Sequence, residues 1–431
     1  MPTMLYARCV PLAWLCGALL ACASDPVEPP VTPETTDNPG KADSTSCGWS
    51  HHVVDPFIDG IESSAVAMSP DGALHVSYSS PTEGDLRYAV KPSDADPWFH
   101  ETVDPFADGV AHSVIAVDQY GDLHISYTAT TSGQLRYAFK PSGGTWTDVW
   151  VDPFATGVEH STLIVDDAGN VHISYAATGD GHLNYASKPA GGQWTHQWVD
   201  PFANGVTHSQ MLLGPDGALH ISYTATTDGQ LRYAYKPAGG QWTHRWVDPF
   251  AAGVAHSSLV LDDAGGVHIS YTAVTDGDVR YAYKPAGGTW SHAVVDPFAD
   301  GASHSMLILD PAGDLHISYA ATIAGDLRYA YKPAGGQWTH TVVDPFADGV
   351  MHSSFVRDAN GTLHISYTAT ADGDLKYAVK PAGGTWQPTV IDPFADGVWS
   401  STLMIDASNR LNIIYNVLDN GDLAHAVRCQ Q

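Results

Sequence analysis

The octapeptide VDPFADGV at Val103–Val110 recurs almost letter for letter through most of the chain, and its spacing indicates the fold. The first step between neighbouring copies is 49 residues and every later step is 48. The eight copies begin at Val54, Val103, Val151, Val199, Val247, Val295, Val343 and Ile391. A fixed period of this length indicates a repeat architecture, in which each unit buries its apolar surface against its neighbours. One such architecture accounts for residues 47–431.

Within one repeat, four short β-prone runs alternate with turn-forming sequences. In the third unit the runs are STLIV, VHISYAA, HLNYASK and WTHQWV, and they are separated by DDAGN, TGDG and PAGG. Runs rich in β-branched and aromatic residues, bounded by Gly, Pro and Asp, predict strands. Four strands per unit at this period are typical of a β-propeller blade. The predicted fold class is therefore all-β, an eight-bladed β-propeller of four-stranded blades.

The two ends of the repeat array complement each other. A lone outer-strand sequence, CGWSHHVV, precedes the first octapeptide, and only three strands follow the last one. We therefore expect the N-terminal strand to complete the last blade and close the ring. Cys47 and Cys429 stand at the two ends of the array, and their placement predicts a disulfide beside this closure. A link that closes so long a loop would add on the order of a few kcal/mol in an oxidising compartment.

The residues before the array have a different character. Residues 1–21 have Arg8 ahead of the apolar run VPLAWLCGALLA, which predicts an export signal. The sequence LLAC at Leu19–Cys22 resembles the lipobox of bacterial lipoproteins, which implies lipidation of Cys22 and, with Ala23 after it, the outer membrane or cell surface. An ordinary secretory signal that is cleaved nearby is the alternative. Residues 22–46 are rich in Pro, Thr and Asp, and this composition predicts a disordered tether.

Several positions are identical in all eight repeats and so provide an internal comparison. They are the Phe of the octapeptide, the Gly three residues after it, a Trp in the outer strand and the Tyr of the ISY sequence. Large aromatic residues at one phase of every blade predict packing between blades, and the Gly predicts a bend with positive φ. The Phe positions are Phe57, Phe106, Phe154, Phe202, Phe250, Phe298, Phe346 and Phe394.

A histidine three residues after this Gly is the main candidate for a binding role. Because the innermost strand should begin here, we expect these side chains to ring the mouth of the central channel, and we call the set the collar. Its members are His112, His160, His208, His256, His304 and His352, with Ser63 and Ser400 in the remaining two blades. No cofactor is expected. A metal at the collar is the less favoured alternative, because zinc requires three or four ligands to converge at about 2.0–2.1 Å.

A second histidine series lies in the middle of a predicted strand, within LHISY. The last blade has Asn412 at this position, so we expect a buried hydrogen-bonding role rather than catalysis. The other members are His75, His124, His172, His220, His268, His316 and His364.

Charge restricts the class of ligand. The chain carries 47 Asp and Glu against 19 Lys and Arg, a formal net charge of -28, and the loops on the channel face contain no Lys or Arg. Nucleic acid and acidic polysaccharides are therefore disfavoured on that face. The basic residues recur instead on the third strand, as in LRYAYKPAGG, and we expect them to reach toward the opposite face.

The sequences DDAGNVHISY and DLHISYTATTSGQLRYAFK resemble the BNR, or Asp-box-like, propeller repeats of secreted bacterial proteins, which include sialidases, polysaccharide lyases and lectins. The Trp of the Asp-box itself is missing, and the arginines recur as a periodic strand residue rather than as a sialidase-like cluster. No catalytic residue is therefore carried over from this family.

Near-identical blades place the same group eight times around an axis, whereas catalysis needs unlike groups in one place. The favoured hypothesis is therefore a non-enzymatic, monomeric cell-surface protein that binds neutral glycans multivalently, lectin-like, through clefts between blades. The alternative is a structural or protein-docking scaffold whose partners are envelope or surface proteins, with the membrane reached only through the lipid anchor. A glycosidase or lyase is the less favoured third hypothesis.

Overall fold

The structure is a computed structural model that describes residues 48–428, apart from residues 57–59, 62, 81–83, 108, 204, 226–227, 250, 252, 274, 300, 348, 370–372, 394, 396 and 419–420. The export signal, Cys22, the tether and the proposed Cys47–Cys429 disulfide lie outside the described residues. Within the described part, no helix is long and apolar enough to cross a membrane.

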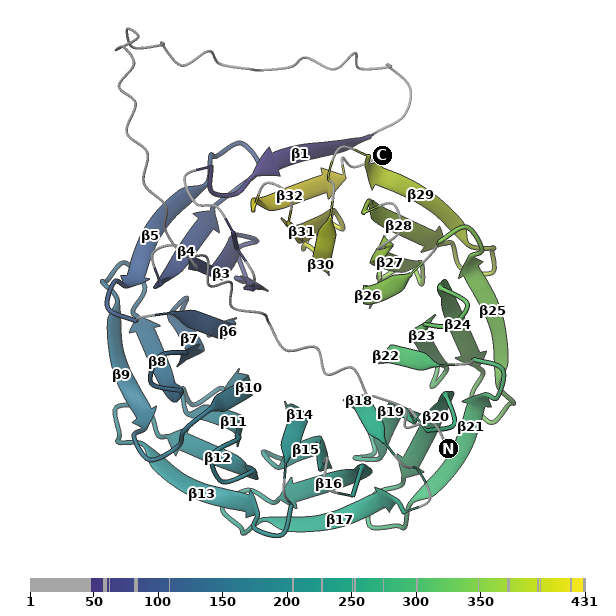
Figure 1. Ribbon diagram of the computed structural model, residues 1–431, viewed down its shortest axis with the longest axis horizontal. Helices are drawn as coiled ribbons and strands as arrows, with labels where there is room; N and C mark the ends of the chain where they lie inside the picture. Colours follow the sequence, from purple (N-terminus) through teal and green to yellow (C-terminus); the bar gives the residue numbers. More distant parts are fainter. Residues whose placement is uncertain are drawn as a thin grey trace, which may run out of the picture. The chain divides into compact units, whose positions relative to one another are not determined.

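The described residues form eight antiparallel four-stranded sheets arranged as the blades of a propeller (Figure 1), as the sequence predicts. The innermost strands are β2 (Ser64–Met68), β6 (Val110–Val117), β10 (Val158–Val165), β14 (Val206–Leu213), β18 (Val254–Leu261), β22 (Ala302–Leu309), β26 (Val350–Arg357) and β30 (Val398–Ile405). The second strands are β3 (Leu74–Ser80), β7 (Leu123–Ala129), β11 (Val171–Ala177), β15 (Leu219–Ala225), β19 (Val267–Ala273), β23 (Leu315–Ala321), β27 (Leu363–Ala369) and β31 (Leu411–Val417).

The third strands are β4 (Asp85–Lys91), β8 (Gln134–Lys140), β12 (His182–Lys188), β16 (Gln230–Lys236), β20 (Asp278–Lys284), β24 (Asp326–Lys332), β28 (Leu375–Lys380) and β32 (Leu423–Arg428). The outermost strands are β5 (Phe99–Asp104), β9 (Thr147–Asp152), β13 (Thr195–Asp200), β17 (Thr243–Asp248), β21 (Ser291–Asp296), β25 (Thr339–Asp344), β29 (Gln387–Asp392) and β1 (Trp49–Val53). We number the blades from 1, which holds β2–β5, to 8, which holds β30–β32 and β1.

The ring closes as the sequence predicts. Strand β1 pairs antiparallel with β32, from Trp49 opposite Arg428 to Val53 opposite Ala424, and supplies the outermost strand of blade 8. Figure 1 shows β1 lying alongside β32 at this junction. The first and last strands of the array are thus held in one sheet.

The core lies between the blades. The second strands are buried along almost their whole length, because both faces of each blade are covered by neighbouring blades. The Tyr of ISY is at most 1 % exposed in every blade. The outer-strand Trp of one blade packs edge-on against a third-strand Tyr of the preceding blade, as in the Trp290–Tyr233 pair with ring centroids 5.3 Å apart. The prediction that Tyr and Trp pack between blades is confirmed.

The prediction for the octapeptide Phe is wrong. Its side chain is 71–88 % exposed at all five positions that the structure describes, Phe106, Phe154, Phe202, Phe298 and Phe346. The reason is the turn that Asp and Gly build around it. Asp104 Oδ1 accepts a hydrogen bond from the Phe106 backbone N–H at 2.9 Å, and Gly109 has φ 85°. The turn therefore needs Asp and Gly, whereas the Phe side chain projects away from the protein.

Candidate functional site

The collar histidines lie on the innermost strands, each at a β-bulge. In blade 3, Glu159 pairs with Ala176 and Ser161 with Tyr175, so His160 is the extra residue between them. His112, His160 and His304 have φ between 50° and 53°, a left-handed conformation that is costly for a residue with a side chain. Strained residues of this kind concentrate at binding and active sites, and here they face the channel.

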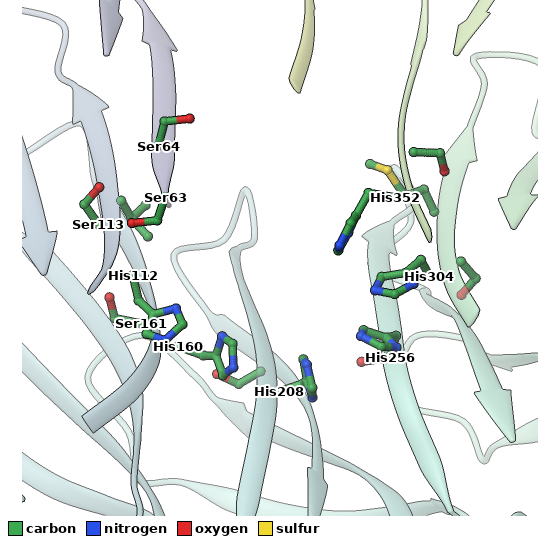
Figure 2. A pocket seen from close by; sticks show the side chains of 16 residues that line it. Ser63, Ser64, His112, Ser113, His160, Ser161, His208, His256, His304 and His352 are labelled. Carbon is green, nitrogen blue, oxygen red and sulfur yellow. The ribbon is translucent and has the colours of Figure 1, made fainter. Parts of the chain in front are cut away.

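The bulges direct the imidazoles into one shared cavity of about 500 Å³ at the propeller axis. Figure 2 shows the rings following one another around its wall, with serines from the same strands beside them. Ring centroids of consecutive blades are 4.0–4.9 Å apart, and His256 and His304 are the nearest pair. The six histidines therefore form a continuous row of imidazoles.

The row is uncharged at neutral pH. Burial lowers the pKa of every collar histidine, and repulsion between protonated neighbours adds to this effect in three of them. The pKa falls to about 4 for His160 and His304 and to about 3 for His256. Glu159 of blade 3 opposes the lowering of the pKa of His112 in blade 2. The cavity consequently presents neutral nitrogen donors and acceptors together with serine hydroxyls.

The two serines of the predicted collar occupy different places. Ser63 lines the cavity. In blade 8 the bulge falls one residue earlier, because Ser400 pairs with Asn416 and leaves Trp399 as the extra residue. The Trp399 indole therefore stands at the end of the row, 5.6 Å from the His352 ring, and neither Trp399 nor Ser400 lines the cavity. Sequence position alone had pointed to Ser400 rather than Trp399.

The geometry of the row bears on the metal alternative. Consecutive rings lie side by side around a wall, whereas a zinc site needs three or four nitrogens that point at one spot. Among the residues that the structure describes, no group of three His, Cys, Asp or Glu side chains is placed to hold a metal ion.

The second histidine series is structural, as predicted. Each Nδ1 lies 2.6–2.7 Å from the hydroxyl of a Tyr on the neighbouring third strand, in seven blades. In the last blade the partners are exchanged, and His425 Nε2 lies 3.0 Å from Asn412 Oδ1. Burial lowers the pKa of these histidines, so they are neutral hydrogen-bonding groups.

A joint between neighbouring blades, which the repeat pattern alone does not reveal, explains why every octapeptide carries an Asp. Tyr223 of blade 4 donates its hydroxyl proton to Asp200 Oδ2 of blade 3 at 2.7 Å, and Arg232 Nη1 lies 2.8 Å from the same oxygen. Burial alone would raise the pKa of Asp200, but the hydrogen bonds from Tyr223, Phe202 N–H and Arg232 outweigh it and lower that pKa. The Tyr–Asp bond recurs at all eight joints, at 2.6–2.7 Å.

No protein-family model matches this chain, and no curated protein does either. Among solved structures it is similar to the Dos1 propeller, with a TM-score of 0.57 and 11 % identity over 88 % of this chain and 95 % of that one. It is also similar to an ulvan lyase of polysaccharide lyase family PL25, with a TM-score of 0.52 and 15 % identity over 86 % and 95 % of the two chains. At these identities the likeness shows the β-propeller fold and nothing about activity.

Proposed function

We propose that this protein is a non-catalytic, lectin-like binding protein that holds a neutral, hydroxyl-rich ligand in the collar cavity. The observation that carries the proposal is the convergence of six uncharged imidazoles and the serine hydroxyls beside them on one cavity of about 500 Å³. Cavities of this size fit a small ligand. The proposed ligand is a neutral glycan.

The chemistry of the wall supports a neutral sugar. A neutral imidazole donates a hydrogen bond through one nitrogen and accepts one through the other, and a serine hydroxyl does both. Sugar hydroxyls likewise donate and accept, while the aromatic ring faces suit the apolar C–H groups of a sugar. An anionic polymer such as nucleic acid finds no cation among the residues that line the cavity.

The same lining supports binding rather than catalysis. Acid–base chemistry on a glycan typically uses an ionised carboxylate beside a proton donor. The described residues that line the cavity include neither Asp nor Glu. We also propose that the protein is a monomer exported to the outer membrane or cell surface and anchored through Cys22, on the support of its N-terminal sequence.

A glycan array probed with the purified protein tests the proposal. Replacing both His256 and His304 with Ser, the residue that blade 1 carries at this position, should abolish binding to neutral glycans because it removes the closest imidazole pair. The matched control is His196→Ala, an exposed residue of an outer strand. An array without binding, or equal binding by the double variant, contradicts the proposal. Loss of binding in EDTA alone would assign the collar to a metal instead.

The exposed octapeptide Phe residues favour a second candidate function, a docking scaffold for an envelope protein. Exposed aromatic side chains are enriched where proteins bind partners. Replacing Phe106, Phe154, Phe202, Phe298 and Phe346 with Ser should abolish recovery of one identified envelope protein and its binding in purified form. Each single replacement should change the free energy of unfolding by no more than about 0.5 kcal/mol, because the side chains are exposed. A larger loss of stability, or unchanged recovery, contradicts this function.

A further inference from the structure

On the other face of the propeller, away from the octapeptide turns, a cleft of about 580 Å³ lies between blades 4 and 5. Blade 4 contributes His220, Tyr233 and Arg245, and blade 5 contributes Lys284 and Trp290. A cleft with corresponding lining, of about 240 Å³, lies between blades 1 and 2. The two clefts are built from the same repeat positions, so their differences show what each can hold.

Between blades 1 and 2, the protein's own carboxylate occupies this place. Glu101 lies opposite Tyr88 in the β4–β5 pair. Its oxygens accept hydrogen bonds from Lys140 Nζ at 2.6 and 2.7 Å and from Trp146 Nε1 at 2.8 Å. A lysine and an indole N–H at this repeat position thus form a carboxylate-binding pair.

Between blades 4 and 5 the same pair is present without the carboxylate. Arg245 stands where blade 1 has Glu101, because it lies opposite Tyr233 as Glu101 lies opposite Tyr88. Trp290 packs against Tyr233 with ring centroids 5.3 Å apart, the same separation as Trp146 and Tyr88. Trp290 Nε1 is buried and has no hydrogen-bond partner among the described residues, as in five other blades, so the pair of cations is what distinguishes this cleft. This cleft therefore combines two cations and an unpaired donor, in a chain whose net charge is -28.

Blades 4 and 5 also differ at the turn between their first and second strands. In blade 5, His268 Nε2 lies 3.1 Å from Asp262 Oδ2, at the turn between the first and second strands. Gly214 holds the position of Asp262 in blade 4, and both backbone N–H groups make the same turn hydrogen bond. His220 therefore faces Gly214 instead of a carboxylate at this repeat position. Asp216 supplies the nearby negative charge, and both side chains line the cleft.

We propose that the cleft between blades 4 and 5 is a second binding site, which takes a sugar carrying a single carboxylate. The ligand carboxylate occupies the place that Glu101 fills in the neighbouring cleft, where Lys284, Trp290 and Arg245 bind it. Asp216 and Asp263 also line the cleft. Their carboxylates accept hydrogen bonds from sugar hydroxyls and repel a doubly charged group such as a phosphate.

Calorimetric titration of the purified protein with D-glucuronate tests the proposal, with D-glucose and acetate as comparison ligands. D-glucuronate should bind more tightly than either, because only it offers both the carboxylate and the hydroxylated ring. Arg245→Glu recreates the arrangement of blade 1, so its new carboxylate should pair with Lys284 and Trp290. This variant should bind D-glucuronate at least about tenfold more weakly, since a hydrogen bond to a charged group is worth about 1.5 kcal/mol or more.

The matched control is Gln197→Glu, which makes the corresponding change opposite Tyr185 in blade 3 and should leave D-glucuronate binding unchanged. Lys284→Gln removes one of the two cations of the cleft and should also weaken binding, which keeps the test decisive if Arg245→Glu fails to fold. Absence of D-glucuronate binding, equal affinity for acetate or glucose, or equal loss in Gln197→Glu overturns the proposal. The His256 and His304 double variant should retain this binding, so failure here and failure of the collar proposal are separate results.

Discussion

Replacing Asp200 with alanine is expected to destabilise the propeller by about 3 kcal/mol, the lower end of the range of about 3 to 5 kcal/mol for removing one partner of a buried ion pair. The carboxylate is fully buried, and the substitution leaves the Tyr223 hydroxyl and one Arg232 nitrogen without their acceptor. The loss stays at the lower end of this range because Arg232 keeps a second carboxylate partner, with its Nη2 2.5 Å from Asp228 Oδ2. Urea-induced unfolding, followed by circular dichroism, measures it.

Asp152→Ala provides the matched control. Asp152 accepts the corresponding hydrogen bond from Tyr175 at 2.6 Å, but blade 3 has Asn184 at the position of Arg232. The expected loss is about 1.5 to 2 kcal/mol, the lower part of the range for hydrogen bonds to a charged group, because no buried cation is left behind. Equal losses in the two variants would show that the Arg–Asp contact adds nothing to the joint.

Acidification from pH 7 to pH 4 is expected to lower the free energy of unfolding steeply. The folded-state pKa of His160 and His304 is about 4 and that of His256 about 3, whereas an unfolded histidine titrates near its ordinary value of about 6.5. Between these values the unfolded chain binds protons that the folded chain does not. The stability that these histidines contribute is therefore fully present above about pH 6.5 and is lost as the pH is lowered. Each such histidine contributes about 1.4 kcal/mol per pH unit across this window.

The double variant with Ser at positions 256 and 304 should show a shallower fall, because it lacks two of the groups that titrate only in the unfolded chain. The slope of the double variant is compared with that of His196→Ala, which removes an exposed histidine outside the cavity. Unfolding free energies measured by urea titration at half-unit steps between pH 7 and pH 4 give both slopes. A stability that stays flat over this range would show that the imidazoles are charged or solvated in the folded protein.

The architecture could be predicted from the sequence because period, strand number and the phase of the two ends are local patterns that repeat. The 48-residue step and the lone strand before the first octapeptide were enough to place β1 in the last blade. The prediction for the octapeptide Phe failed for a definable reason. Identity in every repeat shows that a residue is retained, but burial depends on the backbone direction that Asp104 and Gly109 impose.

Site residues could be predicted from the sequence only where the same residue type recurs at one position of the repeat. The collar followed from six histidines at one phase, whereas Trp399 enters the row through a one-residue shift in the bulge, which pairing between strands decides. The Tyr–Asp–Arg joint needs the contact between neighbouring blades. The cleft between blades 4 and 5 did leave a signal in the sequence, since Gly214 replaces a recurrent Asp and Arg245 adds a positive charge at a variable position of the same blade.

The pairing of β1 with β32 also sets an order of events during biosynthesis. The strands it joins carry residues 377 positions apart, such as Ser50 and Val427. At about 5 to 20 residues per second, the first strand waits roughly 20 to 75 s for its partner to be made. Until then the nascent chain carries an open strand edge, which promotes association between chains. A premature stop before β32 would leave that edge open permanently, so the ring closes only after β32 has been made.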